Sequence, residues 1–290
     1  MYMFKNNKVK NIIGSVTILV LSICIFPLIT SFTNSSTSIN HLPEPPKPKG
    51  KIIVLDAGHG GRDPGAVGKL SREKDIALAI ALKLGKKIES EIPGTTVIYT
   101  RKTDFYPNLY ERPALANKHH ADLFVSIHLN AGGSSTRRVK NKKGKWVTQK
   151  VANSSARGTE TFVLGYNNMD NQDVAIRENS SILLEENHQD NYGGFDPKDP
   201  SSYIVFKVLK RKYRDQSIRL AKLMQEEYVR AGRPNRGIKE GPFAVLKTAG
   251  MPAVLTEVGF ISNSEEEKFL MSSKGQETIV NSLFNAIKKF

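Results

Sequence analysis

Three short, largely apolar runs, each ending on a titratable side chain, constrain the fold of this chain more than any other feature. The first spans 52–55 and leads to His59, the second spans 122–128 and ends on His128, and the third spans 253–257 and ends on Glu257. Runs of this length and composition predict strands that are buried on both faces, as in parallel sheets. Because the carboxyl ends of parallel strands lie at one edge, we expect these three side chains to be neighbours.

Helical and strand patterns alternate between these runs. Apolar residues at every fourth position from Ile76 to Ile88 predict an amphipathic helix over 76–89, with its cap near Ser71. Further strands are expected over 96–100, 159–164 and 241–246, and further helices through Leu115 and over 173–186, 214–230 and 276–289. This alternation predicts an α/β domain in which crossover helices flank a parallel sheet.

The loop after the first strand is rich in glycine, at positions 58, 60, 61 and 65. Such a loop needs unusual backbone angles or a close approach of its backbone to another group. Glu73 is expected in the first turn of the next helix, facing the loop that carries His59. Taken one at a time, Glu73 is an ordinary carboxylate stabilised by the helix dipole, and His59 is an ordinary loop residue.

Cysteine usage narrows the chemistry. Cys24 is the only cysteine among 290 residues, so the body of the chain has neither a disulfide framework nor a thiolate metal site. A metal ion would have to be held by histidine and carboxylate side chains. With 39% hydrophobic and 24% charged residues, the chain has the composition of a globular protein with a sizeable core.

The chain opens with a targeting pattern, in which three lysines before residue 11 precede an uncharged, almost continuously apolar run over 12–29. This pattern predicts a secretory signal peptide or a membrane anchor. A lipoprotein signal at Cys24 is the weaker alternative, because the preceding Ile23 is not a small residue. The expected organisation is a signal peptide or anchor over 1–31, a Pro/Ser-rich linker over 32–50, and an exported main domain over 51–290 that works in the periplasm or cell envelope.

A basic insertion at about 134–157 concentrates the positive charge of the chain. No acidic residue occurs from 123 to 159, whereas eight lysines and arginines do. We expect a solvated loop or a β-hairpin with Trp146 near its tip. It is either a variable surface insertion or a patch for a polyanion, and export favours an anionic cell envelope over nucleic acid.

His59, Glu73 and His128 together predict a site for one zinc ion with a fourth position open to water. Two histidines and one carboxylate with an open position are typical of catalytic zinc, whereas structural zinc sites are usually closed and rich in cysteine. Glu257 would remain off the metal and act as the base that deprotonates the attacking water.

Seven motifs, in order along 51–290, resemble the zinc-dependent N-acetylmuramoyl-L-alanine amidases (type 3) of bacterial cell walls. They are LDAGHGGRDPG (55–65), EKD (73–75), Thr100-Arg101 with Asp104 and Arg112, ADLFVSIHLN (121–130), RGTET (157–161), RGIK (236–239) and MPAVLTEVGFISN (251–263). The resemblance implies zinc on His59, Glu73 and His128, and Glu257 as the catalytic acid and base. It also implies a single three-layer α/β domain with a mixed, mostly parallel six-stranded sheet flanked by helices.

The resemblance further implies peptidoglycan as the substrate, cleaved at the amide between the lactyl group of N-acetylmuramic acid and L-alanine. One alternative is a zinc peptidase that acts within the stem peptide, and another is a wall-binding module without activity. We expect no nucleic-acid partner, and contact with a membrane only through the N-terminal segment.

The segment 165–202 lies where some members of that family carry a helix that covers the zinc until a partner protein removes it. Glu178, Glu185 or Glu186 would then occupy the fourth zinc position, and an activator protein would be a partner. The alternative is a plain surface helix. Three further histidines, His119, His120 and His188, are expected to be solvated or structural.

Overall fold

The computed structural model describes residues 50–290 apart from 141–143, 153–154, 167–171 and 209–211. The signal peptide or anchor predicted over 1–31 falls outside the described residues, as does the predicted linker but for Gly50. Among the helices of the described residues, none combines the length and the apolar character that crossing a membrane requires.

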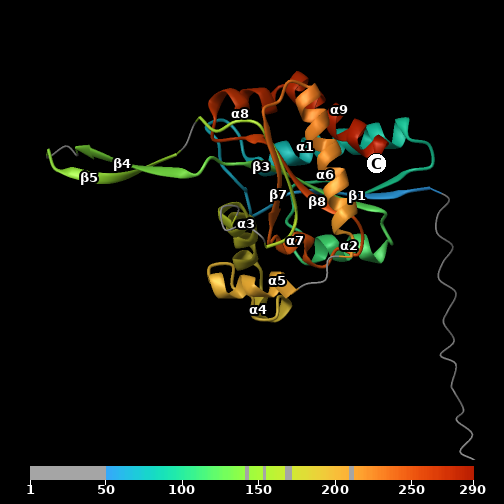
Figure 1. The fold of residues 1–290 in the computed structure, drawn as a ribbon, viewed down its shortest axis with the longest axis horizontal. Coiled ribbons are helices and arrows are strands. Elements are labelled where there is room, and N and C mark those ends of the chain that lie inside the picture. The colour runs from blue at the N-terminus through green and yellow to red at the C-terminus, as the bar shows by residue number, and fades with distance from the viewer. Residues whose placement is uncertain (1–49, 141–143, 153–154, 167–171, 209–211) are drawn as a thin grey trace, which may run out of the picture. The chain divides into compact units, whose positions relative to one another are not determined.

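A mixed six-stranded sheet with the order β2-β1-β3-β8-β6-β7 forms the middle layer (Figure 1). Its strands are β1 (Ile52–Ala57), β2 (Thr96–Tyr99), β3 (Leu123–Asn130), β6 (Thr159–Leu164), β7 (Asn235–Gly241) and β8 (Ala253–Phe260). All neighbouring pairs are parallel except β6 and β8, which are antiparallel. The three runs expected to end side by side therefore do so, because they form the adjacent parallel strands β1, β3 and β8.

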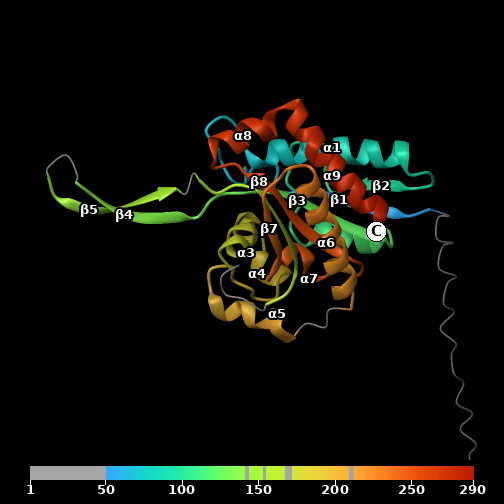
Figure 2. The ribbon, with the colours of Figure 1, turned by 45° about the horizontal axis from the view of Figure 1, so that its top comes forward.

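Helices cover both faces of the sheet (Figure 2). On one face lie α1 (Glu73–Glu91), α6 (Arg214–Arg230), α8 (Ser264–Met271) and α9 (Ser273–Lys289). On the other lie α2 (Glu111–Lys118), α3 (Gln172–Asn179) and α7 (Ala244–Lys247), together with a segment of short helices: η2 (Ser180–Leu184), α4 (His188–Asn191), η3 (Pro200–Ile204) and α5 (Val205–Val208). Two buried apolar clusters, one on each face, hold the three layers together, and the predicted three-layer α/β architecture is confirmed.

The face of the sheet that carries α3 changes from apolar to polar along the strands. Val54, Phe124 and Leu255 belong to the apolar cluster of this face. Because side chains on one face recur every second residue, the same face then presents His128 and Glu257, which are paired in register on β3 and β8. Ordinary strand alternation thus delivers the titratable groups of the site to one edge of one face.

The basic insertion was expected to be a solvated loop or a β-hairpin, and it is a β-hairpin. Strands β4 (Ser134–Lys140) and β5 (Trp146–Ala152) form a separate antiparallel sheet, in which Lys140 pairs with Trp146. The side chains of Arg138 and Lys140 lie over the exposed indole of Trp146, at 5.8 and 5.4 Å from the ring.

One predicted element on the site side of the sheet is wrong, and another differs in its helix type. The strand expected over 241–246 is instead the end of β7 followed by α7, whose Val245 and Leu246 pack in the apolar cluster beside α3. The helix expected over 173–186 is an α-helix only to Asn179 and continues as the 3₁₀ helix η2 to Leu184. The Asn179 amide binds the backbone at Pro242 and Ala244.

The cap predicted near Ser71 is also wrong, and one helix was not predicted. Helix α1 begins at Glu73 after Arg72 without a side-chain cap, and the Ser71 hydroxyl instead donates to Glu267 of α8. Neither α8 nor the earlier start of α9 at Ser273 was predicted, since Ser272 caps α9 where the pattern shows only polar residues.

Candidate metal centre

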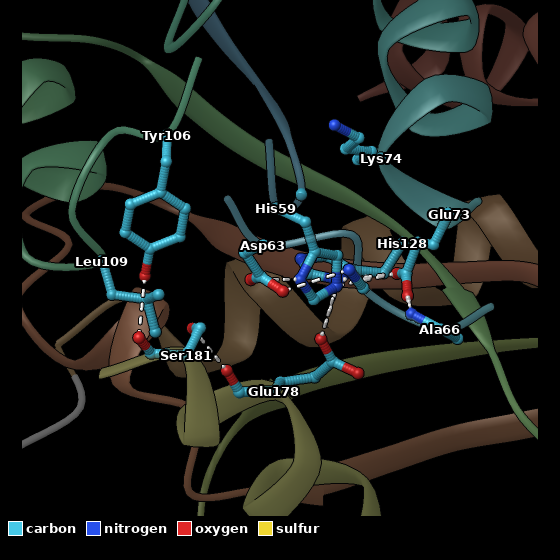
Figure 3. Close-up of polar contacts among 12 residues, drawn as sticks. His59, Asp63, Ala66, Glu73, Lys74, Tyr106, Leu109, His128, Glu178 and Ser181 are labelled. Atoms are coloured by element: carbon cyan, nitrogen blue, oxygen red, sulfur yellow. Dashed lines mark hydrogen bonds and ion pairs between the residues drawn. The ribbon is translucent and has the colours of Figure 1, made fainter. Parts of the chain in front are cut away.

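The side chains of His59, Glu73 and His128 converge at the carboxyl ends of β1 and β3 and the start of α1 (Figure 3). Glu73 Oε1 lies 3.1 Å from His59 Nε2 and 3.0 Å from His128 Nδ1. The two imidazole rings meet edge to face with their centroids 4.8 Å apart. The structure therefore brings together the three residues that the sequence predicted as a zinc site.

Bonds to the surrounding backbone fix the Glu73 carboxylate. Glu73 Oε1 accepts a hydrogen bond from the Leu129 N–H at 2.8 Å, and Oε2 accepts one from the Ala66 N–H at 2.8 Å. Glu73 is fully buried, and these two bonds tie α1 to β3 and to the glycine loop. Its position is thus set by the fold rather than by the cluster alone.

The His59 ring is oriented by Asp63, a residue for which no role was predicted. His59 Nδ1 lies 2.7 Å from Asp63 Oδ2, which leaves Nε2 to face Glu73. A carboxylate on the far nitrogen of a histidine fixes the ring and its tautomer, as the partners of metal-binding histidines commonly do. The position of Asp63, four residues after His59 in the same loop, was the signal available in the sequence.

Two glycines of the loop make room for the rings. A Cβ on Gly58 would lie 2.4 Å from His128 Cε1, and a Cβ on Gly65 would lie 2.6 Å from His59 Cδ2. Gly65 also has a φ of +65°, which side chains other than glycine rarely adopt. The glycines therefore allow the backbone to approach the cluster, as the sequence predicted.

Glu178 on α3 fills the fourth position of the cluster. Its Oε2 atom lies 3.0 Å from both His59 Nε2 and His128 Nδ1, and ligand atoms of all four residues lie within 4.8 Å of one another. This conformation therefore corresponds to the covered alternative considered from the sequence, in which a glutamate takes the fourth position in place of water. Of the three candidate residues for that position, Glu185 bonds instead to Tyr106 and Tyr192, and Glu186 is exposed.

The four side chains of the cluster fit a divalent cation as ligands. Among the described residues, His59 Nε2 and Glu178 Oε2 are two of only four buried side-chain atoms without a hydrogen-bond partner, although they face each other. These two atoms lie 3.0 Å apart but form no hydrogen bond, which is the arrangement expected of two ligands of one metal ion. Two imidazole nitrogens and two carboxylate oxygens are also a donor set that zinc accepts.

The Glu257 carboxylate lies beside the cluster and contacts Arg177. Glu257 is fully buried, its Oε1 lies 3.4 Å from Arg177 Nη2, and its Oε2 lacks a hydrogen-bond partner within the described part of the chain. Arg177 Nη2 also lies 2.8 Å from Glu178 Oε1. On α3, Arg177 thus contacts Glu257, and the next residue, Glu178, contacts the two histidines. The role of Arg177 was not predicted, although the Arg-Glu pair lies in the segment expected to cover the metal.

Burial and mutual attraction shift the titration of the cluster in opposite directions. Burial and the charge of Glu178 raise the pKa of Glu73, but the attraction of His59 and the hydrogen bonds with His128 and His59 together outweigh them and bring that pKa to about 2. Burial lowers the pKa of His128, but Glu178 and Glu73 raise it to about 9. The two ionised carboxylates require compensating positive charge at their centre, which imidazolium groups or a divalent cation can supply.

Burial raises the pKa of Glu257 well above its usual range, and the negative charge of Glu178 raises it further. A carboxyl group with a raised pKa can hold a proton near neutral pH, as a general acid must.

The cavity beside the cluster is too small for a substrate. Its volume is about 10 Å³, and its walls include both histidines, Leu109, Glu178 and Val245. That volume accommodates about one water molecule. This cavity therefore does not accommodate a glycan or a peptide.

The sequence matches the family model described as N-acetylmuramoyl-L-alanine amidase over residues 53–289. The chain belongs to the N-acetylmuramoyl-L-alanine amidase family. The family predicted from the seven motifs is therefore confirmed.

This amidase-family chain is 33% identical over 245 residues to the N-acetylmuramoyl-L-alanine amidase AmiC of Escherichia coli O6:H1. The match covers 82% of this chain and 52% of AmiC, so the chain spans about half the length of that relative. The catalytic domain of the amidase CwlV from Paenibacillus polymyxa superposes with a TM-score of 0.57 at 27% identity, covering 82% of this chain and 97% of that domain. The CwlD amidase of Clostridioides difficile, solved in complex with the GerS lipoprotein, has a TM-score of 0.55 at 30% identity and covers 82% of this chain and 97% of CwlD.

Proposed function

We propose that this chain is a zinc-dependent peptidoglycan hydrolase that cleaves the amide between N-acetylmuramic acid and the L-alanine of the stem peptide. The observation that carries the proposal is the convergence of His59, Glu73 and His128 beside the buried carboxyl of Glu257. Membership of the amidase family supports the choice of bond. One zinc ion per chain would be held by the two histidines and Glu73.

Glu257 moves the proton in the proposed reaction. When bound, the zinc ion supplies Lewis-acid chemistry, because it polarises the scissile carbonyl and lowers the pKa of water. Glu257 takes the proton from the attacking water and later returns it to the departing amine of L-alanine. Asp63 and the backbone donors to Glu73 hold the ligands in place throughout.

The decisive experiment digests purified peptidoglycan and identifies the products by mass spectrometry. We expect release of intact stem peptides that begin with L-alanine, and loss of this release when a chelator removes zinc. Shortened stem peptides would instead indicate a zinc peptidase. No release of any peptide by zinc-loaded protein without the Glu178 carboxylate would indicate a wall-binding module.

Replacing Glu257 with Gln tests the role of the carboxyl separately from metal binding. The variant Glu257→Gln keeps the shape of the side chain but cannot accept the proton, so we expect hydrolysis to fall roughly 10²–10⁴-fold. Zinc content, measured by elemental analysis of the dialysed protein, should remain that of the unchanged protein. Turnover at the original rate would overturn the assignment of Glu257.

We further propose that the conformation described above is a closed state in which α3 blocks hydrolysis. Glu178 competes for the fourth zinc position, and the cavity of about 10 Å³ leaves no room for a glycan or a peptide. A partner that draws α3 away would then activate the enzyme. The solved CwlD–GerS complex, in which a related amidase binds a lipoprotein, supports the idea of a protein partner.

Peptidoglycan as the substrate requires that the domain work outside the cytoplasm. The basic and apolar N-terminal pattern supports export to the periplasm or cell envelope, through a cleaved signal peptide or a retained anchor. Fractionation of cells that produce the full chain, with detection of the protein in envelope and cytoplasmic fractions, tests this proposal.

A further inference from the structure

Strand β7 carries a bulge opposite Glu160. Thr159 pairs with Asn235 and Thr161 pairs with Ile238, so β7 has one residue more than β6 over this stretch. Gly237 absorbs the extra residue with a φ of +88°. Bulges of this kind redirect side chains and are common next to active sites.

The bulge places two cationic side chains on one carboxylate. Residues 236 and 239 are an odd number apart and would point to opposite faces of a regular strand. With the extra residue between them, Arg236 Nε and Lys239 Nζ both contact Glu160, the lysine at 3.1 Å from Oε2. Asn130 Nδ2 donates to the same oxygen at 3.4 Å.

The charge of this group is unbalanced. The Glu160 side chain is 1% exposed, whereas the side chains of Arg236 and Lys239 are 39% and 26% exposed. One buried negative charge therefore holds two cations at the surface, which leaves a surplus of one positive charge. A carboxylate buried in this way orients its partners, while their remaining N–H groups stay accessible to an anion.

Glu160 and its two cationic partners lie next to Glu257 at the same edge of the sheet. Glu160 pairs in register with Glu257, so both carboxylates lie on the same face of adjacent strands. Neighbouring strands are about 4.8 Å apart. The backbones of β7 and β8 are therefore roughly 10 Å apart, and the cationic groups of β7 reach back to Glu160 on the strand between them. A short peptide that leaves the scissile amide along this edge would reach these cationic groups within one or two residues.

We infer that Arg236 and Lys239, positioned by Glu160, form a subsite for a carboxylate of the stem peptide close to the scissile bond. The inference rests on the proposed amidase function and adds a specificity that the function alone does not require. Arg236 is further steadied by the Phe260 ring, which lies 4.7 Å from its guanidinium carbon. Two cations on one fixed carboxylate favour an anionic group over an uncharged one of the same shape.

The test uses two synthetic muramoyl tripeptides that differ at one group. The residue after L-alanine carries a free α-carboxylate in one peptide and the uncharged carboxamide in the other. Hydrolysis of both is measured in the full-length protein carrying Glu178→Ala, so that the side chain at the metal position does not limit the rate. We expect the parent to prefer the free acid, and Lys239→Met to reduce the ratio of the two kcat/KM values about 10-fold, mainly through KM.

Arg236→Gln should reduce the same ratio in the same direction, as should the positioning variant Glu160→Gln. Lys274→Met, at an exposed lysine on α9, is the matched control and should leave the ratio unchanged. A ratio near one in the parent, or a ratio that the Lys239 and Arg236 variants do not alter, would overturn the subsite while leaving the amidase function standing. A parent that hydrolyses neither peptide would instead overturn the proposed function, and the subsite with it.

Discussion

The four side chains of the metal cluster are held in two different ways. His59 lies in the loop that follows β1, Glu73 begins α1 and His128 lies on β3. Both oxygens of Glu73 accept hydrogen bonds from backbone N–H groups. Glu178 belongs to α3. Its Oε1 contacts the neighbouring Arg177, and its Oε2 faces the two histidines. Three of the positions are therefore built into the sheet and its first helix, and the fourth is brought by a separate segment.

This difference suggests which part of the site is permanent and which part can leave. Removing a group that the fold holds in place destroys the site. Removing a group that only competes for the site exposes it, and the two kinds of change should therefore have opposite effects on activity. Their zinc content should differ as well.

The largest expected effect is on the permanent part. In His128→Ala the cluster loses a nitrogen ligand, so we expect zinc to fall from about one ion per chain towards none, and hydrolysis to be lost with it. Elemental analysis after dialysis measures the zinc. His119→Ala, at an exposed histidine, is the control and should retain the metal. Full zinc content in His128→Ala would contradict the proposed ligand set.

The second prediction concerns the removable part and has the opposite sign. Glu178→Ala removes the competing carboxylate, so we expect kcat/KM on soluble muropeptides to rise about 10-fold or more while zinc is retained. Glu186→Ala, an exposed glutamate of the same segment, is the matched control. If Glu178→Ala lost both zinc and activity, Glu178 would be a permanent ligand and the closed-state proposal would fail.

The smallest expected effect is on the stability of the fold, through the buried ion pair of Asp56 and Arg112. Burial raises the pKa of Asp56, but Arg112, Ser126 and Thr100 outweigh burial and lower it overall. A lowered pKa in the folded state adds stability at pH values above the unfolded pKa of about 3.9, and this stability is lost as the pH falls through the folded value. Arg112 also donates to the carbonyl of His59 at 3.0 Å, so this ion pair supports the loop of the site.

Asp56→Asn should therefore destabilise the protein by about 3 kcal/mol at pH 7, and by progressively less as the pH falls below about 4. Urea unfolding at several pH values measures the free energy. Asp215→Asn, at a fully exposed carboxylate, serves as the control. An equal loss of stability for Asp56→Asn at pH 7 and in acid would show that the charge of Asp56 contributes nothing.

The strands of the site and the three side chains that the fold holds in the cluster were predictable because their signals are local. An apolar run followed by a histidine, or by a glutamate, is visible within ten residues, and strand alternation then fixes the face. The strand expected over 241–246 failed because Val245 and Leu246 are buried by other helices, and a short apolar run does not distinguish a strand from a helical turn. The bulge at Gly237 was not predictable, because it is defined by pairing with β6.

The sequence by itself determined the residue types of the site, the family to which the chain belongs, and the edge of the sheet at which His59, His128 and Glu257 meet. Only the tertiary structure decided that Glu178, rather than Glu185 or Glu186, fills the fourth position, and that Arg177 reaches Glu257. The physical reason is that strand positions follow from a periodicity of two residues. The placement of α3 depends instead on long-range packing, such as the Asn179 amide binding the backbone at Pro242 and Ala244, which no local pattern contains.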